Sequence, residues 1–191
     1  MRVLVACEFT GAVRDAFRRL GHEAWSNDLE DVEPEGEFKN YHFFGDCREI
    51  IPAYGPWDLL IAHPPCTHLS VSGARWFKEK QQEQAEALEF VRWLLAAPVP
   101  RIALENPVSI ISSRIRKPDQ IVHPWHFGHP ESKATCWWLK NLQKLRPTKI
   151  IPSNFHKQSC FRAPPSPTRG RDRSRFYPGM AAAMAEQWGN L

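Results

Sequence analysis

The chain has 191 residues, of which 42% are hydrophobic and 24% charged, a length and composition that suit one soluble domain with a sizeable core. No apolar run reaches membrane length, no secretory signal pattern opens the chain, and five scattered cysteines without C-x-x-C spacing argue against a disulfide framework or a zinc knuckle. The net charge is +4, with six acids and no base over 28–37 and six bases and one acid over 157–175, which permits a nucleic-acid partner. We therefore expect a cytoplasmic protein with reduced thiols that contacts no membrane.

Short apolar runs alternate with helical patterns along the first half of the chain. The runs predict strands at 2–6, 22–26, 41–44, 59–62 and 101–104. Helices are expected between them, at 11–20, from about residue 48, and at 74–97. This alternation is typical of a single α/β domain with a mostly parallel sheet, which we expect over residues 1–191.

The second half of the chain is less regular. Residues 121–127 and 135–139 predict two further strands, expected to be antiparallel and joined by a turn at 128–133. Over 142–178 the composition shifts to proline, serine, arginine and lysine with little periodicity, which indicates an irregular basic segment. Residues 179–189 then predict a short amphipathic helix.

Three histidines recur at every third position: His123, His126 and His129. A strand would place alternate side chains on opposite faces, so the three would not converge on one ion. We therefore expect no metal site.

Two predicted strands end in a reactive side chain beside proline. The strand at 59–62 is followed by Pro64-Pro65-Cys66, and the strand at 101–104 by Glu105-Asn106-Pro107. The carboxyl ends of parallel strands form the edge where α/β sheets bind ligands, and a thiol held there is a candidate nucleophile once a positive neighbour lowers its pKa. Alone, the cysteine also fits a buried structural residue and the glutamate a helix cap. Two such strand ends on one edge favour a catalytic pair.

Three further features at strand ends are candidates for binding a cofactor. The turn at 7–11 contains Glu8 and one glycine, Gly11, before the first helix; it is not a phosphate loop, because that needs more glycine and no acid. Asp28 follows the second strand, where an acid commonly binds the ribose hydroxyls of a nucleoside cofactor, although it also begins a solvated acidic run. Asp46 fits either a ligand contact or the N-cap of the helix that follows it.

In this order, these residues resemble the cytosine-5 DNA methyltransferases, and particularly their short phage- and prophage-type members. Pro64-Pro65-Cys66 matches the motif that carries the catalytic thiol in that family, and Glu105-Asn106 matches the pair after the next strand. Asp28 and Asp46 fall where the family has its acids for ribose and adenine, and Gly179-Met180-Ala181 is similar to its C-terminal motif. The resemblance implies a Rossmann-like S-adenosylmethionine-dependent methyltransferase fold, with helices on both faces of the sheet.

The resemblance also implies roles. Cys66 would add to carbon 6 of cytosine in DNA, and Glu105 would hold or donate a proton at N3. S-adenosylmethionine would be the methyl donor, with its contacts from Glu8, Phe9, Gly11, Asp28, Asp46 and Pro64. Lys133 and Thr135 fall near a basic motif that supports the family's active site, and the base that removes the carbon 5 proton stays unassigned. In duplex DNA the target base would have to be flipped out. Such a protein would act in the cytoplasm of a bacterial host cell.

The chain departs from the family in three places. Full-length members insert a large target-recognition region, and here only 142–178 takes that place; sequence selection could then rest with a separate specificity protein. The turn at 7–11 keeps one glycine of a Phe-x-Gly-x-Gly pattern, and Thr67 follows the cysteine in place of glutamine. Four arginines of the short segment are candidates for contacting DNA phosphates, although they also fit a solvated surface: Arg169, Arg171, Arg173 and Arg175.

Two other functions stay open. The same fold could modify a free nucleotide, RNA or another base position, which would explain the short recognition segment. A catalytically silent nucleic-acid-binding protein could also keep this fold; the intact Cys66 and Glu105 argue against it, and the reduced glycine turn argues for it. Methylation of an exocyclic amine is disfavoured, because His63 and Cys66 occupy the two deciding positions of the motif that such enzymes use.

Overall fold

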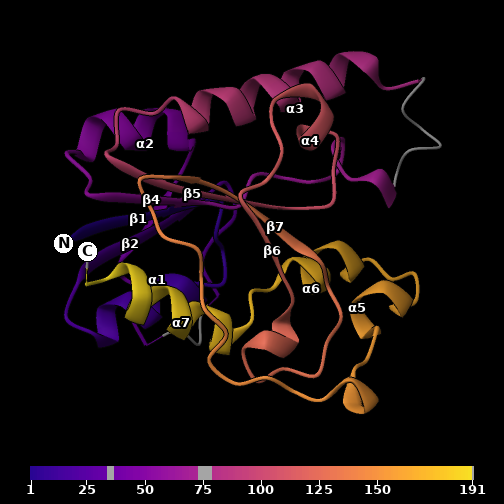
Figure 1. The fold of residues 1–191 in the computed structure, drawn as a ribbon. Coiled ribbons are helices and arrows are strands. Elements are labelled where there is room, and N and C mark those ends of the chain that lie inside the picture. Colours follow the sequence, from indigo (N-terminus) through magenta and orange to yellow (C-terminus); the bar gives the residue numbers. More distant parts are fainter. Residues whose placement is uncertain (34–36, 73–78, 191) are drawn as a thin grey trace.

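A seven-stranded sheet forms the centre of the computed structural model, which describes residues 1–33, 37–72 and 79–190 (Figure 1). Across the sheet the strands follow in the order β3 (His42–Phe44), β2 (Glu23–Asp28), β1 (Arg2–Ala6), β4 (Leu59–Ala62), β5 (Arg101–Pro107), β7 (Thr135–Lys140) and β6 (Gln120–Val122). Strands β3 to β5 in this order pair in parallel, and β7 runs antiparallel to both β5 and β6. The sheet is therefore mostly parallel.

Helices cover both faces of the sheet (Figure 1). On one face lie α2 (Cys47–Tyr54), α3 (Gln81–Leu95) and α4 (Ile111–Arg114), and on the other lie α1 (Ala12–Arg19) and α7 (Pro178–Trp188). Shorter helical turns in the loops include η2 (Pro124–His126), η3 (Ser153–Phe155), α5 (Ser159–Arg162) and α6 (Arg169–Ser174). The expected Rossmann-like α/β fold is thus confirmed. None of the helices in the described ranges is long and apolar enough to cross a bilayer.

The central strands β4 and, after Arg2, β1 are apolar at every position because both faces of the sheet are covered. Along β1, Val3 and Val5 pack with the helices α1 and α7, whereas Leu4 and Ala6 pack with α2 and α3. All four side chains are fully buried. Successive side chains of a strand point to opposite faces, so a strand covered on both sides needs an apolar residue at each position.

The closing helix α7 has the amphipathic pattern expected at 179–189. Met180, Ala183, Met184 and Trp188 are buried in the same cluster as the apolar side chains on one face of β1. Trp188 meets the Trp137 ring edge-on at 5.5 Å between centroids, and its indole nitrogen donates to a backbone carbonyl oxygen at 2.9 Å. The end of the chain therefore completes the core beside the first strand.

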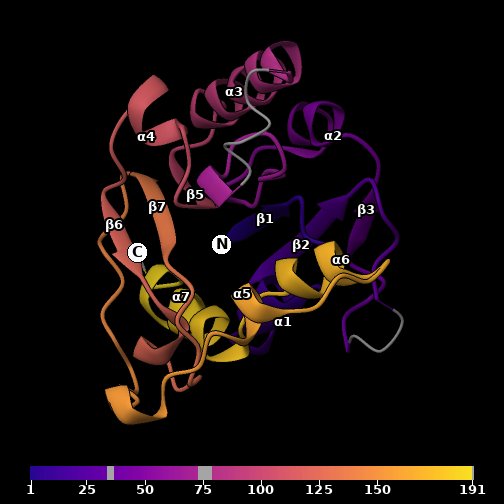
Figure 2. The same ribbon diagram turned by 90° about the vertical axis from the view of Figure 1, so that its right-hand side faces the viewer.

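The carboxyl ends of the parallel strands meet at one edge of the sheet, which faces the viewer in Figure 2. The helices α5 and α6 pass across this edge on the side of α1 (Figure 2). They belong to the segment 142–178, which is mostly irregular as expected but contains these short helices and η3. This segment thus lies beside the edge where ligands bind in such folds.

The strand predicted at 121–127 ends early. β6 stops at Val122, and Pro124 opens η2, because proline donates no ladder hydrogen bond and its fixed φ suits the start of a helix. His126 lies in this helical turn, so the strand alternation used to separate the three histidines does not apply. In the part of the chain that the structure describes, no group of three or more histidine, cysteine, aspartate or glutamate side chains could hold a metal ion.

Other predicted elements also differ in their bounds, such as the second strand, which is expected at 22–26 and observed at Glu23–Asp28. The strand at 101–104 continues to Pro107, because its last three residues pair with β7 across the sheet. The helix expected at 74–97 is observed as Gln81–Leu95. The start of the predicted helix, over residues 73–78, lies outside the described residues.

Trp188→Ala is expected to lower the free energy of unfolding by about 3–5 kcal/mol, because it leaves a cavity against Trp137 and removes a buried hydrogen bond. Phe155→Ala is the matched control: Phe155 is 59% exposed, so its loss should change the free energy by less than about 0.5 kcal/mol. Urea unfolding followed by far-ultraviolet circular dichroism measures both. Equal stabilities of the two variants would contradict the packing of α7.

Candidate active site at the carboxyl edge of the sheet

A hydrogen bond joins the turn that follows β4 to the end of β5. Parallel pairing sets Ala62 beside Leu104, so the residues that follow these two lie side by side. The Asn106 side chain, which is 1% exposed, donates from Nδ2 to the Pro64 carbonyl oxygen at 2.9 Å. The asparagine of the Glu-Asn pair therefore fixes the turn that carries Cys66.

The loops that follow β4 and β5 pair with each other through their backbones. The Cys66 carbonyl oxygen accepts hydrogen bonds from the Leu69 and Ser70 amides at 3.0 and 2.9 Å, which closes a tight turn. Ser70 forms an antiparallel bridge with Ser109, and the Ile110 amide donates to the Leu69 carbonyl oxygen at 3.0 Å. The cysteine is thus held on a turn with a defined conformation.

Cys66 is exposed at this edge, with groups of both charges near its sulfur. Desolvation by the surrounding protein and the charge of Glu105 raise the pKa of the thiol, whereas the charges of Lys133 and Arg173 lower it, and the net direction is upward. Positive neighbours are present, but in the free protein they lower the pKa of the thiol by less than burial and Glu105 raise it. The thiol is therefore protonated at neutral pH and has to lose its proton before it can act as a nucleophile.

Glu105 forms a partly buried pair with His63. The two side chains are 13% and 11% exposed, and Oε2 of Glu105 lies 3.3 Å from Nδ1 of His63. Burial raises the pKa of the Glu105 carboxyl, but the hydrogen bond to His63 and the charge of Lys133 outweigh burial, so its pKa lies below the ordinary value. The carboxylate is ionised at neutral pH. Sequence reasoning missed His63 as a site residue, although it directly precedes Pro64.

Lys133 reaches this site from the loop before β7. Its Nζ donates to the Arg173 carbonyl oxygen at 3.1 Å, and the Thr135 hydroxyl donates to the Lys133 carbonyl oxygen at 3.3 Å. Its charge lowers the pKa of both Glu105 and Cys66. The basic side chain that the resemblance places beside the active site is therefore close to the thiol and the carboxylate.

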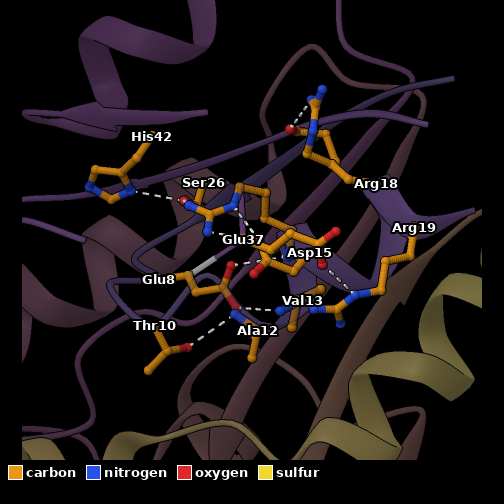
Figure 3. A network of polar contacts seen from close by, with 12 residues as sticks. Glu8, Thr10, Ala12, Val13, Asp15, Arg18, Arg19, Ser26, Glu37 and His42 are labelled. Carbon is orange, nitrogen blue, oxygen red and sulfur yellow. Dashed lines mark hydrogen bonds and ion pairs between the residues drawn. The ribbon is translucent and has the colours of Figure 1, made fainter. Parts of the chain in front are cut away.

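Glu8 caps the first helix (Figure 3). Its carboxylate accepts hydrogen bonds from the Val13 amide at 2.7 Å and the Arg14 amide at 3.3 Å, and the Ala12 amide donates to Thr10 Oγ1 at 3.3 Å. The first amides of α1 are thus satisfied within the protein, which explains why this turn is not a phosphate loop. Burial raises the pKa of the Glu8 carboxyl. Its two oxygens point into the protein, so any cofactor contact of Glu8 would come from its main chain.

A buried polar network packs beside this turn (Figure 3). The fully buried Arg14 guanidinium lies 2.7 Å from the Asp15 carboxylate and donates to Ser26 Oγ at 2.8 Å, and Ser26 Oγ lies 2.8 Å from His42 Nδ1. Gly11 has φ +70°, and a Cβ there would collide with the Arg14 guanidinium. The turn therefore requires glycine. Sequence reasoning missed this network, because an arginine on a helix normally indicates a solvated face.

Asp28 and Asp46 lie at the ends of β2 and β3. Asp28 Oδ1 accepts the Glu30 amide at 3.1 Å, and burial raises the pKa of the Asp28 carboxyl. Asp46 is the N-cap of α2: its side chain accepts the Arg48 amide at 2.9 Å and lies 2.8 Å from the Arg48 guanidinium, which holds the pKa of Asp46 below its usual value. Of the two interpretations of Asp46, the structure shows the cap, and a ligand contact would have to use the same carboxylate.

Arg171 of helix α6 and Arg175, which directly follows this helix, contact the acidic loop after β2, at the edge seen in Figure 2. The Arg171 guanidinium lies 3.1 Å from Glu30 Oε2 and 4.6 Å from the centroid of the Phe9 ring. Arg175 lies 2.6 Å from Glu33 Oε2. Two of the arginines predicted to contact phosphates are thus paired within the chain, because its acidic and basic runs fold against each other.

The other two arginines have different surroundings. Arg169 Nε donates to the Ala163 carbonyl oxygen at 2.7 Å. Arg173 is close enough to Cys66 for its charge to lower the pKa of the thiol, and its buried Nε has no hydrogen-bond partner among the described residues. Arg173 is therefore the arginine of this set that the structure brings to the cysteine.

The sequence-predicted residues form two groups on this edge. The first group surrounds the thiol after β4 and β5 and contains Cys66, Glu105, Lys133 and Arg173. The second group lies at the ends of β1, β2 and β3 and contains Glu8, Phe9, Gly11, Asp28 and Asp46. Pro64 is buried in the turn after β4. The first group has the makings of a nucleophilic site, and the second offers carboxylates and an apolar ring to a ligand.

No protein-family model matches the chain, and no curated protein matches it in sequence. Its fold does match solved structures. The methyltransferase EhMeth of Entamoeba histolytica aligns with a TM-score of 0.50 and 16% identity, covering 79% of this chain and 57% of that chain. A candidate DNA modification methyltransferase encoded within an E. coli prophage aligns with a TM-score of 0.49 and 13% identity, covering 80% of this chain and 52% of that chain.

A mutant of Spodoptera frugiperda DNMT2 aligns with a TM-score of 0.42 and 15% identity, covering 78% of this chain and 54% of that chain. The chain thus spans a little over half the length of each of these structures. At such identities the likeness shows the fold alone. The chemistry has to be argued from the residues at the carboxyl edge.

Glu105→Gln is expected to make Cys66 react several-fold faster with iodoacetamide near neutral pH. The substitution removes a negative charge that raises the pKa of the thiol, so the thiolate fraction increases. Lys133→Met should slow the reaction, because it removes a positive charge that lowers the same pKa. Mass spectrometry of the Cys66 peptide at a series of pH values measures both effects. Identical rates in the three proteins would contradict the observed arrangement of charges.

Proposed function

We propose that this protein is an S-adenosylmethionine-dependent methyltransferase that acts on carbon 5 of cytosine in DNA through a covalent bond to Cys66. One observation carries the proposal: the exposed thiol on the turn after β4 and the partly buried Glu105 carboxylate at the end of β5 are held together by the Asn106–Pro64 hydrogen bond of 2.9 Å. A nucleophile and a carboxylate fixed side by side suit a reaction in which one adds to a base while the other handles a proton. The fold, which the Entamoeba histolytica methyltransferase shares, agrees with methyl transfer.

The ends of β1, β2 and β3 fit the methyl donor. The half-buried Asp28 carboxyl makes no ion pair among the described residues, and its raised pKa reports a burial that hydrogen-bond donors such as ribose hydroxyls would offset. The Phe9 ring would pack against the methyl donor, the Asp46 carboxylate would accept a hydrogen bond from its adenine amine, and Pro64 would contact it from the turn after β4. When bound there, S-adenosylmethionine would supply a methyl group on a positively charged sulfur.

Cys66 and Glu105 would act on opposite sides of the same ring. Carbon 5 of cytosine is a poor nucleophile until a thiolate adds to carbon 6. The neighbouring charges of Lys133 and Arg173 favour the thiolate, and the base would displace water from around the exposed thiol. Glu105 would face N3, where negative charge develops as the sulfur–carbon bond forms.

The thiol lies between two loops, so a cytosine in duplex DNA would have to leave the helix to reach it. Lys133 and Arg173 would then meet the phosphate of the flipped nucleotide. The remaining predicted arginines would contribute less, since two of them are paired with acids of the same chain. DNA binding is therefore expected to be modest at physiological salt.

One observation favours a second candidate with the same chemistry. Arg171 and Arg175 are neutralised by Glu30 and Glu33, so the segment 142–178 presents less positive charge than its composition indicates. A free cytidine nucleotide or a single-stranded RNA would need fewer backbone contacts than duplex DNA. The acceptor, and not the role of Cys66, separates this candidate from the main proposal.

Oligonucleotides that carry 5-fluorocytosine are expected to trap the protein covalently when S-adenosylmethionine is present, because fluorine blocks the final loss of a proton from carbon 5. Cys66→Ser should abolish both the adduct and methyl transfer, by at least about 10³-fold, while the fold stays intact. Cys160→Ser serves as the matched control and should form the adduct normally. Gel electrophoresis of the adduct and transfer of a labelled methyl group provide the two measurements.

The same assay separates the candidates. An adduct with RNA or a fluorinated nucleotide, but not with DNA, would move the proposal to the second candidate. Full methyl transfer by Cys66→Ser would refute the covalent mechanism. Nucleic-acid binding without cofactor binding, measured by calorimetry, would leave the catalytically silent protein as the explanation.

The double substitution Glu30→Gln/Glu33→Gln is expected to tighten DNA binding, because it frees Arg171 and Arg175 from their intramolecular partners. The slope of log affinity against log salt should become steeper by up to about 2, since each further phosphate that an arginine neutralises adds about one unit. The control Glu86→Gln/Glu89→Gln changes the net charge equally on the distant helix α3. Fluorescence anisotropy in a salt series compares the two, and equal slopes would show that these arginines do not reach DNA.

A further inference from the structure

His63 is a single imidazole between two buried carboxylates. Its Nδ1 lies 3.3 Å from Glu105 on the neighbouring strand end. It is also close enough to Glu8, in the turn after β1, for its charge to lower the pKa of that carboxyl. These carboxyls are the charged groups that face His63, and Lys133 and Arg14 act on them in turn. The imidazole therefore lies between Glu105, in the group around the thiol, and Glu8, in the group proposed to bind the cofactor.

The position of His63 follows from strand register. Ala62 pairs with Leu104, so His63 and Glu105 come next on adjacent strands and point to the same face of the sheet. The Phe176 ring lies 4.9 Å from the imidazole and the Trp137 ring 6.3 Å, and the pair is only 11% and 13% exposed. Among the described residues the buried Nε2 atom has no hydrogen-bond partner. The imidazole is thus held by one polar contact, the one to Glu105.

The proposed reaction needs a proton that Glu105 does not hold by itself. The Glu105 pKa lies below its ordinary value, so this group is a carboxylate at neutral pH. A carboxylate beside N3 would repel the charge that develops there. An imidazole is a general acid–base group, and the 3.3 Å contact places the one of His63 where it can pass a proton to Glu105.

We propose that His63 is a proton-relay residue that loads Glu105 with the proton passed to N3 of cytosine. The inference rests on the proposed function and adds a residue to it. His63 does not touch the base; it acts through Glu105. The pair as a whole stores one proton, which is shared between Nδ1 of His63 and Oε2 of Glu105.

Protons and electron pairs balance over the cycle. The exposed Cys66 thiol gives its proton to solvent, and its sulfur bonds to carbon 6. The π pair between carbons 5 and 6 moves to join carbons 4 and 5, and the π pair between carbon 4 and N3 moves onto N3. N3 takes the proton from Glu105, which takes the proton from Nδ1 of His63.

Carbon 5 then gains the methyl group with the pair shared by carbons 4 and 5, while the N3 pair re-forms the double bond to carbon 4. An unassigned base takes the carbon 5 proton, the C–H pair re-forms the double bond between carbons 5 and 6, and the sulfur leaves with its bonding pair. N3 returns its proton to the His63–Glu105 pair, and the thiolate recovers a proton from solvent.

The first test measures the pKa of the Glu105 carboxyl in the free protein. In His63→Gln the amide still donates a hydrogen bond to Glu105 but carries no titratable proton. We expect the pKa of the Glu105 carboxyl to rise, because burial stays while the positive charge is lost. Carbon-13 NMR of the glutamate carboxyls, assigned with Glu105→Gln, measures this. An unchanged Glu105 titration would overturn the proposal, whatever the activity of the protein.

The second test measures how the rate of adduct formation depends on pH. Adduct formation with 5-fluorocytosine DNA is followed in single turnovers over a range of pH, with His22→Gln as the control at the opposite end of the sheet. His63→Gln should be slower by about 10²-fold at neutral pH, and its optimum should move to lower pH, where Glu105 can hold the proton itself. An equal loss at every pH would indicate a purely structural role and would overturn the relay. A wild-type protein that forms no adduct would overturn the proposed function, and the NMR titration would still decide whether the two residues share a proton.

Discussion

The parallel pairing of β4 with β5 determines the geometry on which the candidate site depends. With Ala62 beside Leu104, the chain sets His63 beside Glu105 and Pro64 beside Asn106. The first of these pairs points to the face covered by α1 and α7 and is the proposed acid–base pair. The second becomes the hydrogen bond that orients the turn before the cysteine. A slip of one residue in this register would separate both pairs at once.

The charged groups on this edge are of two physical kinds. Buried ones, such as Arg14 with Asp15, are held by several partners, and removing one member of such a pair typically costs about 3–5 kcal/mol. Exposed ones, such as Arg175 with Glu33, are worth about 0–1 kcal/mol and weaken with salt. The buried network therefore fixes the turn beneath the cofactor side, whereas the pairing of α6 with the acidic loop can exchange for another partner. A proposed enzyme that binds nucleic acid can combine the two: buried pairs hold the site rigid, and exposed arginines can exchange an intramolecular acid for a phosphate.

Much of the fold was predictable because its signals are local. The continuous apolar runs indicated β1, β4 and the start of β5, and the pattern of α7 indicated its buried face. The strand ends pointed to Cys66 and Glu105, since chain order and proline place them on one edge. What the sequence could not predict depends on pairing between distant residues. The contact of His63 with Glu105, the burial of Arg14 and the extension of β5 along β7 each need a neighbour that only the folded chain supplies.

The segment 142–178 illustrates the limit of reading composition alone. Its arginines suggest a surface that grips DNA, yet in the fold the segment and the residues just around it form part of the wall of the site. The Arg173 carbonyl oxygen accepts a hydrogen bond from the Lys133 amine, and the Phe176 ring packs on His63. A segment that completes the surroundings of the proton pair has little chain left to read a long DNA sequence. Its shortness is compatible with the proposed catalysis, because the segment lines the proposed site, and selection of a target would need contacts from elsewhere.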